Sequence, residues 1–172
     1  MSPVQAAPMV LFEEAHWPLV VIVGSGPYTD GDIAEYLVRF RKYATRGEPV
    51  YVLSDARAKA MPSTHYRKRI AEMADAIEAY EPKVVRATSA VLTSALLVGA
   101  ARAVSFLRGG RDVTHYVSTG VEALAWLRGR AAADGVELPA SAGAFARDLD
   151  DHYAAGDAPE AWLPLTQTTS KG

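Results

Sequence analysis

The chain has 172 residues, of which 49% are hydrophobic and 22% charged, so it can bury the core of a folded domain and is not disordered by composition. Its formal net charge of −2 provides no overall attraction to nucleic acid or acidic lipid, and we expect neither as a partner. The absence of cysteine excludes disulfides, cysteine nucleophiles and thiolate metal sites.

The N-terminal residues 1–8 have no positive region followed by an apolar run, which argues against a signal peptide and favours a flexible leader. The longest apolar stretch, residues 90–107, is interrupted by Thr93, Gly99 and Arg102 and is too polar for a comfortable membrane span. We therefore expect a cytoplasmic protein without a membrane span.

Two short apolar runs, 9–13 and 19–23, predict strands, and the brief link between them predicts an antiparallel hairpin. The stretch 24–27, Gly-Ser-Gly-Pro, ends the second run; it lacks both common phosphate-loop patterns and is interpreted as a turn. Residues 29–32 resemble a capping box with Asp in place of Glu, and a helix follows that ends at Gly47.

Residues 49–69 are the part of the sequence that is most informative about the fold and a candidate site. Residues 50–53 predict a strand buried on both faces, and residues 55–63 predict a polar loop after it. Pro62 suits the first turn of a helix, which Ser63 or Thr64 can cap. The helix is indicated by apolar residues at spacings of three and four, namely Tyr66, Ile70, Met73, Ile77 and Tyr80.

Residues 86–92 predict a fourth strand, and residues 96–107 predict a third helix that is apolar almost all round. Such a helix is usually covered on several sides. We expect either a partner or a second copy of the chain, or else the chain's own C-terminal segment, to cover it. The residues assigned to this interface are Leu96, Leu97, Val98, Ala101 and Val104.

Residues 114–117 predict a fifth strand, and Thr119 with Glu122 forms a capping box for a fourth helix that ends at Gly135. Beyond it, residues 137–172 are interpreted as a C-terminal extension with room for one helix, 145–155, followed by a mobile tail. The order β-β-α-β-α-β-α-β-α predicts a domain over residues 9–136 with a mixed, mostly parallel five-stranded sheet.

This order resembles the STAS fold, also called SpoIIAA-like. Two short motifs carry the resemblance: Leu-Ser-Asp-Ala-Arg at 53–57 and Ala-Leu-Ala-Trp at 123–126. They are similar to segments of small bacterial proteins described as STAS/SEC14-like. The resemblance implies a non-enzymatic domain that binds partner proteins. It also implies a phosphorylatable serine near Ser63, although the surrounding family motif is absent here.

The candidate binding residues fall at the predicted loop and the start of the second helix. Asp55 and Arg57 are interpreted as a ligand-facing pair or, more simply, as a loop salt bridge. Ser63, Thr64 and Arg67 form a possible anion site at a helix N-terminus, where free amides favour phosphate; a plain helix cap is the simpler interpretation.

No pattern in the sequence indicates catalysis, a metal or a cofactor. The four histidines have no metal-ligand spacing, and there is no G-x-S-x-G elbow. The sequence thus predicts a non-catalytic STAS-like regulatory or scaffolding domain that acts through contacts with a protein partner, with self-association into a homodimer as a linked prediction. The alternative is a small-molecule or lipid carrier, SEC14-like, with an apolar pocket between sheet and helices.

Overall fold

The computed structural model describes residues 9–80, 83–110 and 114–157. Within them, five strands form one sheet in the order β1-β2-β3-β4-β5. β1 is antiparallel to β2, and all other neighbours are parallel, which confirms the predicted mostly parallel sheet with an antiparallel edge. The strands are β1 (Met9–Glu13), β2 (Leu19–Gly26), β3 (Val50–Lys59), β4 (Val85–Val91) and β5 (Thr114–Val117).

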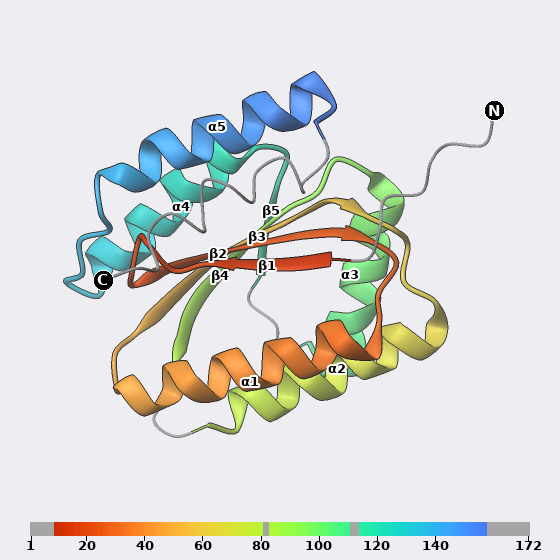
Figure 1. Ribbon diagram of the computed structural model, residues 1–172. Helices are drawn as coiled ribbons and strands as arrows, with labels where there is room; N and C mark the ends of the chain where they lie inside the picture. The colour runs from red at the N-terminus through yellow and green to blue at the C-terminus, as the bar shows by residue number, and fades with distance from the viewer. Residues whose placement is uncertain (1–8, 81–82, 111–113, 158–172) are drawn as a thin grey trace.

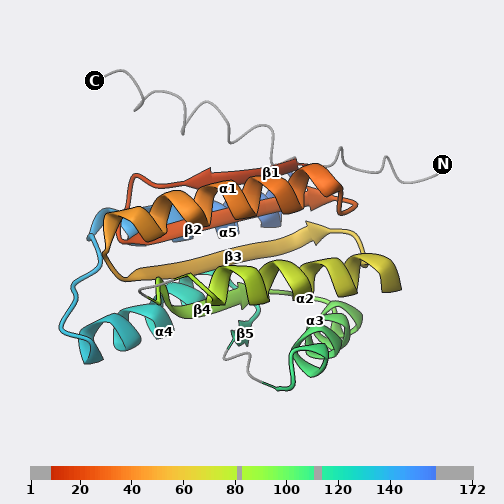
Figure 2. The same ribbon diagram turned by 90° about the horizontal axis from the view of Figure 1, so that it is seen from below.

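Helices cover both faces of the sheet (Figure 1). α4 and α5 lie on one face, and α1 and α2 lie on the other. Figure 2 shows α3 beside α2, toward the β5 edge. The helices are α1 (Asp30–Arg46), α2 (Thr64–Glu78), α3 (Ala95–Leu107), α4 (Gly120–Ala133) and α5 (Ser141–Ala155). Among the described residues, no helix is both long and apolar enough to cross a membrane.

Local capping chemistry sets several helix ends as predicted. Thr29 and Asp32 form the capping box of α1, and Thr119 and Glu122 form that of α4. Gly47 follows α1 with φ of 67°, a conformation that glycine adopts without steric cost. These short-range signals are independent of the rest of the fold, which explains why the sequence shows them.

The alternation of side chains along each strand gives the sheet two separate cores. Under α4 and α5, the core includes Leu19, Val21, Tyr51, Leu53, Val91, Leu124, Leu127, Leu138, Ala142, Ala146 and Leu149. Under α1, the core includes Val20, Ile22, Phe40, Tyr43, Val50, Val52 and Val84. The α5 helix therefore shares the core of α4 and the sheet.

Three element bounds differ from the sequence predictions by three or more residues. β2 continues to Gly26 because its end pairs with β3 after a bulge, so the turn predicted to start at Gly24 was wrong. β3 continues to Lys59, so the predicted polar loop over 55–63 was also wrong for most of its length. α5 begins at Ser141 rather than at residue 145. The predicted leader (1–8), the end of the second helix at 81–82 and the tail beyond 157 lie outside the described residues.

Candidate functional site

Asp55 and Arg57 lie in β3 and are buried, with 3% and 8% of their surface exposed. The Arg57 guanidinium donates hydrogen bonds to both Asp55 carboxylate oxygens at 3.0 and 2.6 Å and to Asp150 Oδ1 of α5 at 2.8 Å. Burial opposes the charge on Arg57, but the hydrogen bonds and charges of the two carboxylates raise its pKa. Asp150 also accepts the backbone N–H groups of Gly120 and Val121, at 2.7 and 3.0 Å. The pair thus belongs to a buried network that joins β3, α4 and α5.

Ser63, Thr64 and Arg67 lie together at the N-terminus of α2. The Ser63 hydroxyl accepts the Tyr66 N–H at 3.3 Å, and Arg67 Nη2 donates to Thr64 Oγ1 at 3.0 Å. This is the geometry of a helix cap, and anion binding there stays a prediction. Since α2 covers the face of the sheet opposite to α4 and α5, these residues do not form one site with the buried carboxylate network.

The stripe assigned to a protein interface on α3 is divided in the structure. Leu97, Ala101 and Val104 turn inward and line a cavity, whereas Leu96 is 74% exposed. Val98 is half-buried. The helix also exposes Phe106, at 83%, and Leu107, at 56%, which lie in the segment 96–107 predicted for self-association but were not among the individual residues assigned to the interface. The interface itself stays a prediction.

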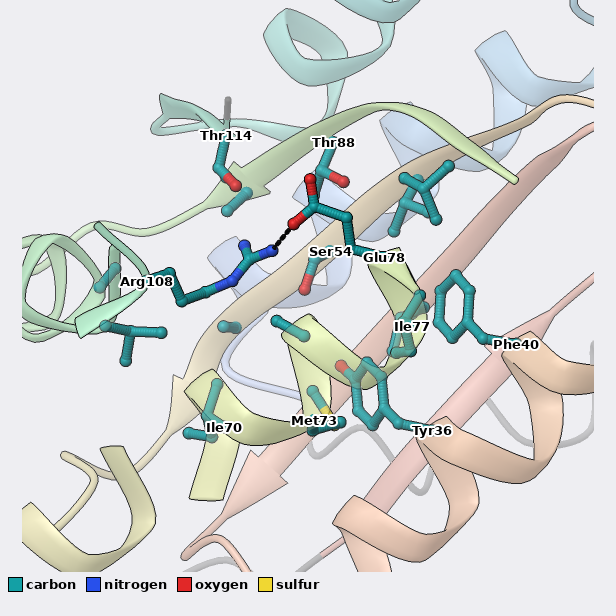
Figure 3. A pocket seen from close by; sticks show the side chains of 18 of the residues that line it. Tyr36, Phe40, Ser54, Ile70, Met73, Ile77, Glu78, Thr88, Arg108 and Thr114 are labelled. Atoms are coloured by element: carbon teal, nitrogen blue, oxygen red, sulfur yellow. Dashed lines mark hydrogen bonds and ion pairs between the residues drawn. The ribbon is translucent and has the colours of Figure 1, made fainter. Parts of the chain in front are cut away.

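A cavity of about 360 Å³ lies between the sheet and the helices α1, α2 and α3 (Figure 3). This volume falls within the range of about 300–1,000 Å³ typical of small-molecule sites. Most of the lining side chains are apolar. The lining also includes Lys83 and Arg86, which are exposed, so the cavity reaches the molecular surface there.

Small side chains on the sheet create this cavity. On the face toward α2, β3 contributes Ser54 and Ala56, and β4 contributes Thr88 and Ala90. Ser54 pairs directly with Ala90 in the parallel register, so the small residues adjoin across the two strands. The opposite face of β3 carries the bulky Tyr51 and Leu53 in a closely packed core. The sheet is therefore filled on one face and hollowed on the other.

The helices supply the apolar walls. Figure 3 shows Ile70, Met73 and Ile77 of α2 together with Tyr36 and Phe40 of α1 around the cavity. The three α2 residues were predicted from their spacing to form an apolar stripe, yet each is only half-buried. All three line the cavity, and Ile77 also packs against the core under α1. The stripe thus forms one wall of the cavity.

Uncharged hydroxyl groups mark the cavity floor. The Tyr36 hydroxyl lies near Ser54, and burial, together with the nearby Tyr28, raises the pKa of Tyr36 well above its ordinary value. Burial and the charge of Asp32 raise the pKa of Tyr28 to about 12. Both phenols therefore stay neutral at physiological pH. The Thr88 side chain has no hydrogen-bond partner among the described residues and lines the same floor.

The two buried charged residues of the lining, Asp32 and Arg108, form ion pairs with the protein itself. Asp32 Oδ2 lies 2.8 Å from Lys59 Nζ, and both side chains are buried. Arg108, at the end of α3, is bound by two carboxylates of α2: its Nε lies 3.0 Å from Asp75 and its Nη2 lies 2.6 Å from Glu78. Figure 3 shows the Arg108–Glu78 pair beside Thr88. The two ion pairs of Arg108 connect the end of α3 to α2 at one end of the cavity.

A signal for this cavity is present in the sequence, although the predicted site residues do not include it. Ser54, Ala56, Thr88 and Ala90 are small residues at alternate positions of two sheet segments, and alternate positions share a face. Two adjacent strands with small residues on the same face, opposite an apolar helix stripe, indicate a hollow. The register that brings them together depends on the tertiary structure.

Comparison with known proteins bears on the fold. No protein-family model matches the sequence, and no curated protein matches it. An uncharacterized protein of the DUF3478 family from Shewanella loihica PV-4, with a SpoIIAA-like fold, is similar in structure with a TM-score of 0.50 and 16% identity, over 74% of this chain and 98% of that one. An anti-sigma factor antagonist from Mycobacterium paratuberculosis aligns with a TM-score of 0.47 and 17% identity, over 71% and 95%.

The Shewanella structure shows that this chain has the SpoIIAA-like fold, which confirms the fold class and the resemblance predicted from sequence. At these identities the likeness concerns the fold alone. Function therefore has to be argued from the residues of this chain.

Proposed function

We propose that the protein is a non-catalytic ligand-binding domain that holds a small, largely apolar molecule between its sheet and the helices α1, α2 and α3. The observation that carries this proposal is the cavity of about 360 Å³. It corresponds to the alternative predicted from the sequence, a small-molecule or lipid carrier with an apolar pocket. The carrier hypothesis requires such a space, and a filled interior would have removed it.

The energetics of the α2 wall support the same function. Ile70, Met73 and Ile77 are half-buried apolar side chains in a helix whose fully buried residue is Ala71. Removing apolar surface from water contributes about 25 cal/mol per Å². A ligand in the cavity would bury the remaining surface of these side chains, so binding is favourable without any rearrangement of the core under α4 and α5.

The test is native mass spectrometry of the full-length protein, with the wild type and two variants. Ala90→Ile adds a β-branched side chain at the cavity floor, where a strand tolerates it. Ala132→Leu, on the exposed side of α4, is the matched control. We expect a small-molecule adduct in the wild type that disappears on denaturation, persists in Ala132→Leu and is lost in Ala90→Ile. An adduct that Ala90→Ile retains, or no adduct and no bound apolar probe in any form, would contradict the proposal.

A second candidate function, contact with another protein molecule, is favoured by α3. Leu96, Phe106 and Leu107 are more than half exposed on a short helix. Their burial by a second copy of the chain would remove these exposed apolar side chains from water. The native mass of the protein tests self-association. We expect the wild type to be a dimer and Phe106→Glu to be a monomer. The control Val38→Glu, at an exposed position of α1, should remain a dimer. A wild-type monomer at micromolar concentration would contradict self-association.

A further inference from the structure

We infer that the ligand is an uncharged, largely apolar molecule that carries a hydroxyl or carbonyl oxygen, and that Thr88 and the Tyr36–Ser54 pair recognise this oxygen. The inference rests on the proposed ligand-binding function and adds the chemical class of the ligand. Its basis is the contrast between the neutral hydroxyl groups on the cavity floor and the ion-paired state of the charged groups around it.

The charges of the lining argue against an ionised ligand. Two of the charged residues that line the described part of the cavity are buried, Asp32 and Arg108. Asp32 is paired with Lys59 at 2.8 Å, and Arg108 is paired with two carboxylates. A ligand carboxylate or ammonium would lose its hydration and would have to displace one of these partners. Placing an unpaired charge in such a site is strongly unfavourable.

The hydroxyl groups argue against a pure hydrocarbon. The Thr88 side chain faces the cavity without a hydrogen-bond partner among the described residues. The hydroxyl groups of Tyr36 and Ser54 also line the cavity, and each oxygen can accept a hydrogen bond. A polar group that is cut off from water without a partner loses stability. Thr88 is half-buried, so water can reach its hydroxyl group from the cavity. A hydrocarbon that fills the cavity would cut this hydroxyl off from water without giving it a partner, whereas a ligand oxygen that reaches Thr88 would form a hydrogen bond with it.

The size of the cavity limits the ligand to a compact molecule. A volume of about 360 Å³ equals roughly a dozen water molecules at about 30 Å³ each in the liquid. This suits a medium-length alkyl chain or a single substituted ring better than a two-chain lipid. The apolar walls from α1 and α2 contact the body of the molecule, and the floor contacts its oxygen.

Three probes of equal chain length but different charge test the inference: octanol, octanoate and octylammonium at neutral pH. Isothermal titration calorimetry with the full-length protein measures their affinities. We expect octanol to bind at least tenfold more tightly than either ion. Chemical shift changes in the ¹H–¹⁵N spectrum should concentrate on β3, β4 and α2, which assigns the binding to the cavity.

The variant Thr88→Val keeps the shape of the side chain and removes its hydroxyl group. We expect it to weaken octanol binding about three- to tenfold, as befits one hydrogen bond, and to keep or strengthen the binding of the hydrocarbon heptane, which no longer covers an unpartnered hydroxyl group. Ala132→Leu should leave both affinities unchanged. Equal losses for octanol and heptane in Thr88→Val would mean that the hydroxyl has a packing role only, and would overturn its assignment.

The outcomes separate the inference from the function on which it rests. If octanoate binds most tightly and Arg108→Gln or Lys83→Gln abolishes that binding, the site takes anions, and the cavity function stands while the inference fails. The same holds for octylammonium with Glu78→Gln. If neither octanol, the ions nor heptane binds in the cavity, the proposed function fails together with the inference.

Discussion

Arg57 Nη1 lies 2.8 Å from Asp150 Oδ1, although 93 residues separate the two in sequence. Arg57 reaches from β3 and Asp150 from α5, and the same carboxylate accepts two N–H groups at the start of α4. The Asp150 side chain therefore serves as the N-terminal cap of one helix while it belongs to another. This arrangement fixes α5 on the sheet by polar contacts in addition to apolar packing.

The Arg57–Asp150 contact yields the first prediction. Arg57→Ala should lower the free energy of unfolding by about 3–5 kcal/mol, because the buried Asp55 carboxylate loses its ion partner. Asp150→Asn should cost less, because the amide oxygen can still accept the Gly120 N–H, although the Val121 N–H loses its acceptor. Chemical denaturation followed by circular dichroism measures both. Asp151→Asn, at the exposed neighbouring position, is the control and should change stability by less than about 0.5 kcal/mol. A small effect of Arg57→Ala would contradict the view that the network is structural.

Gly24 leads to the second prediction. An added Cβ at this position would lie 2.7 Å from Cε of Lys59, whose buried ammonium group pairs with Asp32. Gly24→Ala should therefore displace Lys59 and destabilise the protein by about 1–3 kcal/mol. The matched control is Gly129→Ala in α4, where nothing lies within 4 Å, and which should stabilise the helix by up to about 1 kcal/mol. Equal thermal shifts in the two variants would show that Lys59 moves aside without loss.

The fold could be predicted from sequence wherever a local signal decides the structure. The capping boxes at Thr29 and Thr119 and the left-handed glycine at Gly47 depend on neighbouring residues alone, and the structure confirms them. The alternation of strands and helices was sufficient to predict a mostly parallel sheet, and the short link between the first two strands was sufficient to predict its antiparallel edge. These features need no knowledge of which segments meet in space.

The sequence was less informative where partners come from afar. Asp55 and Arg57 suggested a loop because polar residues rarely continue a buried strand, and their burial depends on Asp150. The cavity was expected only as an alternative, because the small residues Ser54 and Ala90 open a hollow only when the strand register places them side by side. Both failures concern residues whose environment is set by tertiary contacts.

The cavity itself gives the third prediction. In the absence of any ligand, Ala90→Ile should raise the free energy of unfolding by about 0.5–2 kcal/mol, since added apolar volume at the floor gains contacts that the wild type lacks. The measurement is urea denaturation of protein that was unfolded, extracted with organic solvent and refolded. Ala132→Leu again serves as the control. Destabilisation by Ala90→Ile would mean that the cavity walls leave no room at this position.

His16 gives a prediction of pH dependence. Its Nδ1 lies 2.9 Å from Ser141 Oγ, at the start of α5, and the residue is 8% exposed. Burial lowers the pKa of His16, although the charge of Glu13 opposes the shift. The unfolded chain, whose histidine pKa is about 6.5, therefore binds a proton before the folded protein does. Stability due to neutral His16 is fully present above about pH 6.5 and declines as the pH falls from there toward the lowered pKa.

We expect the unfolding free energy of the wild type to decline by less than about 1.4 kcal/mol per pH unit in this window, the limit for one proton. His16→Asn should remove that part of the decline, because asparagine does not titrate, whereas His65→Asn, at an exposed position, should retain it. Urea denaturation at several pH values below 7 makes the comparison. The pH profiles of the two variants must differ if neutral His16, through its contact with Ser141, causes this decline in stability. Identical profiles would place the proton uptake elsewhere in the chain.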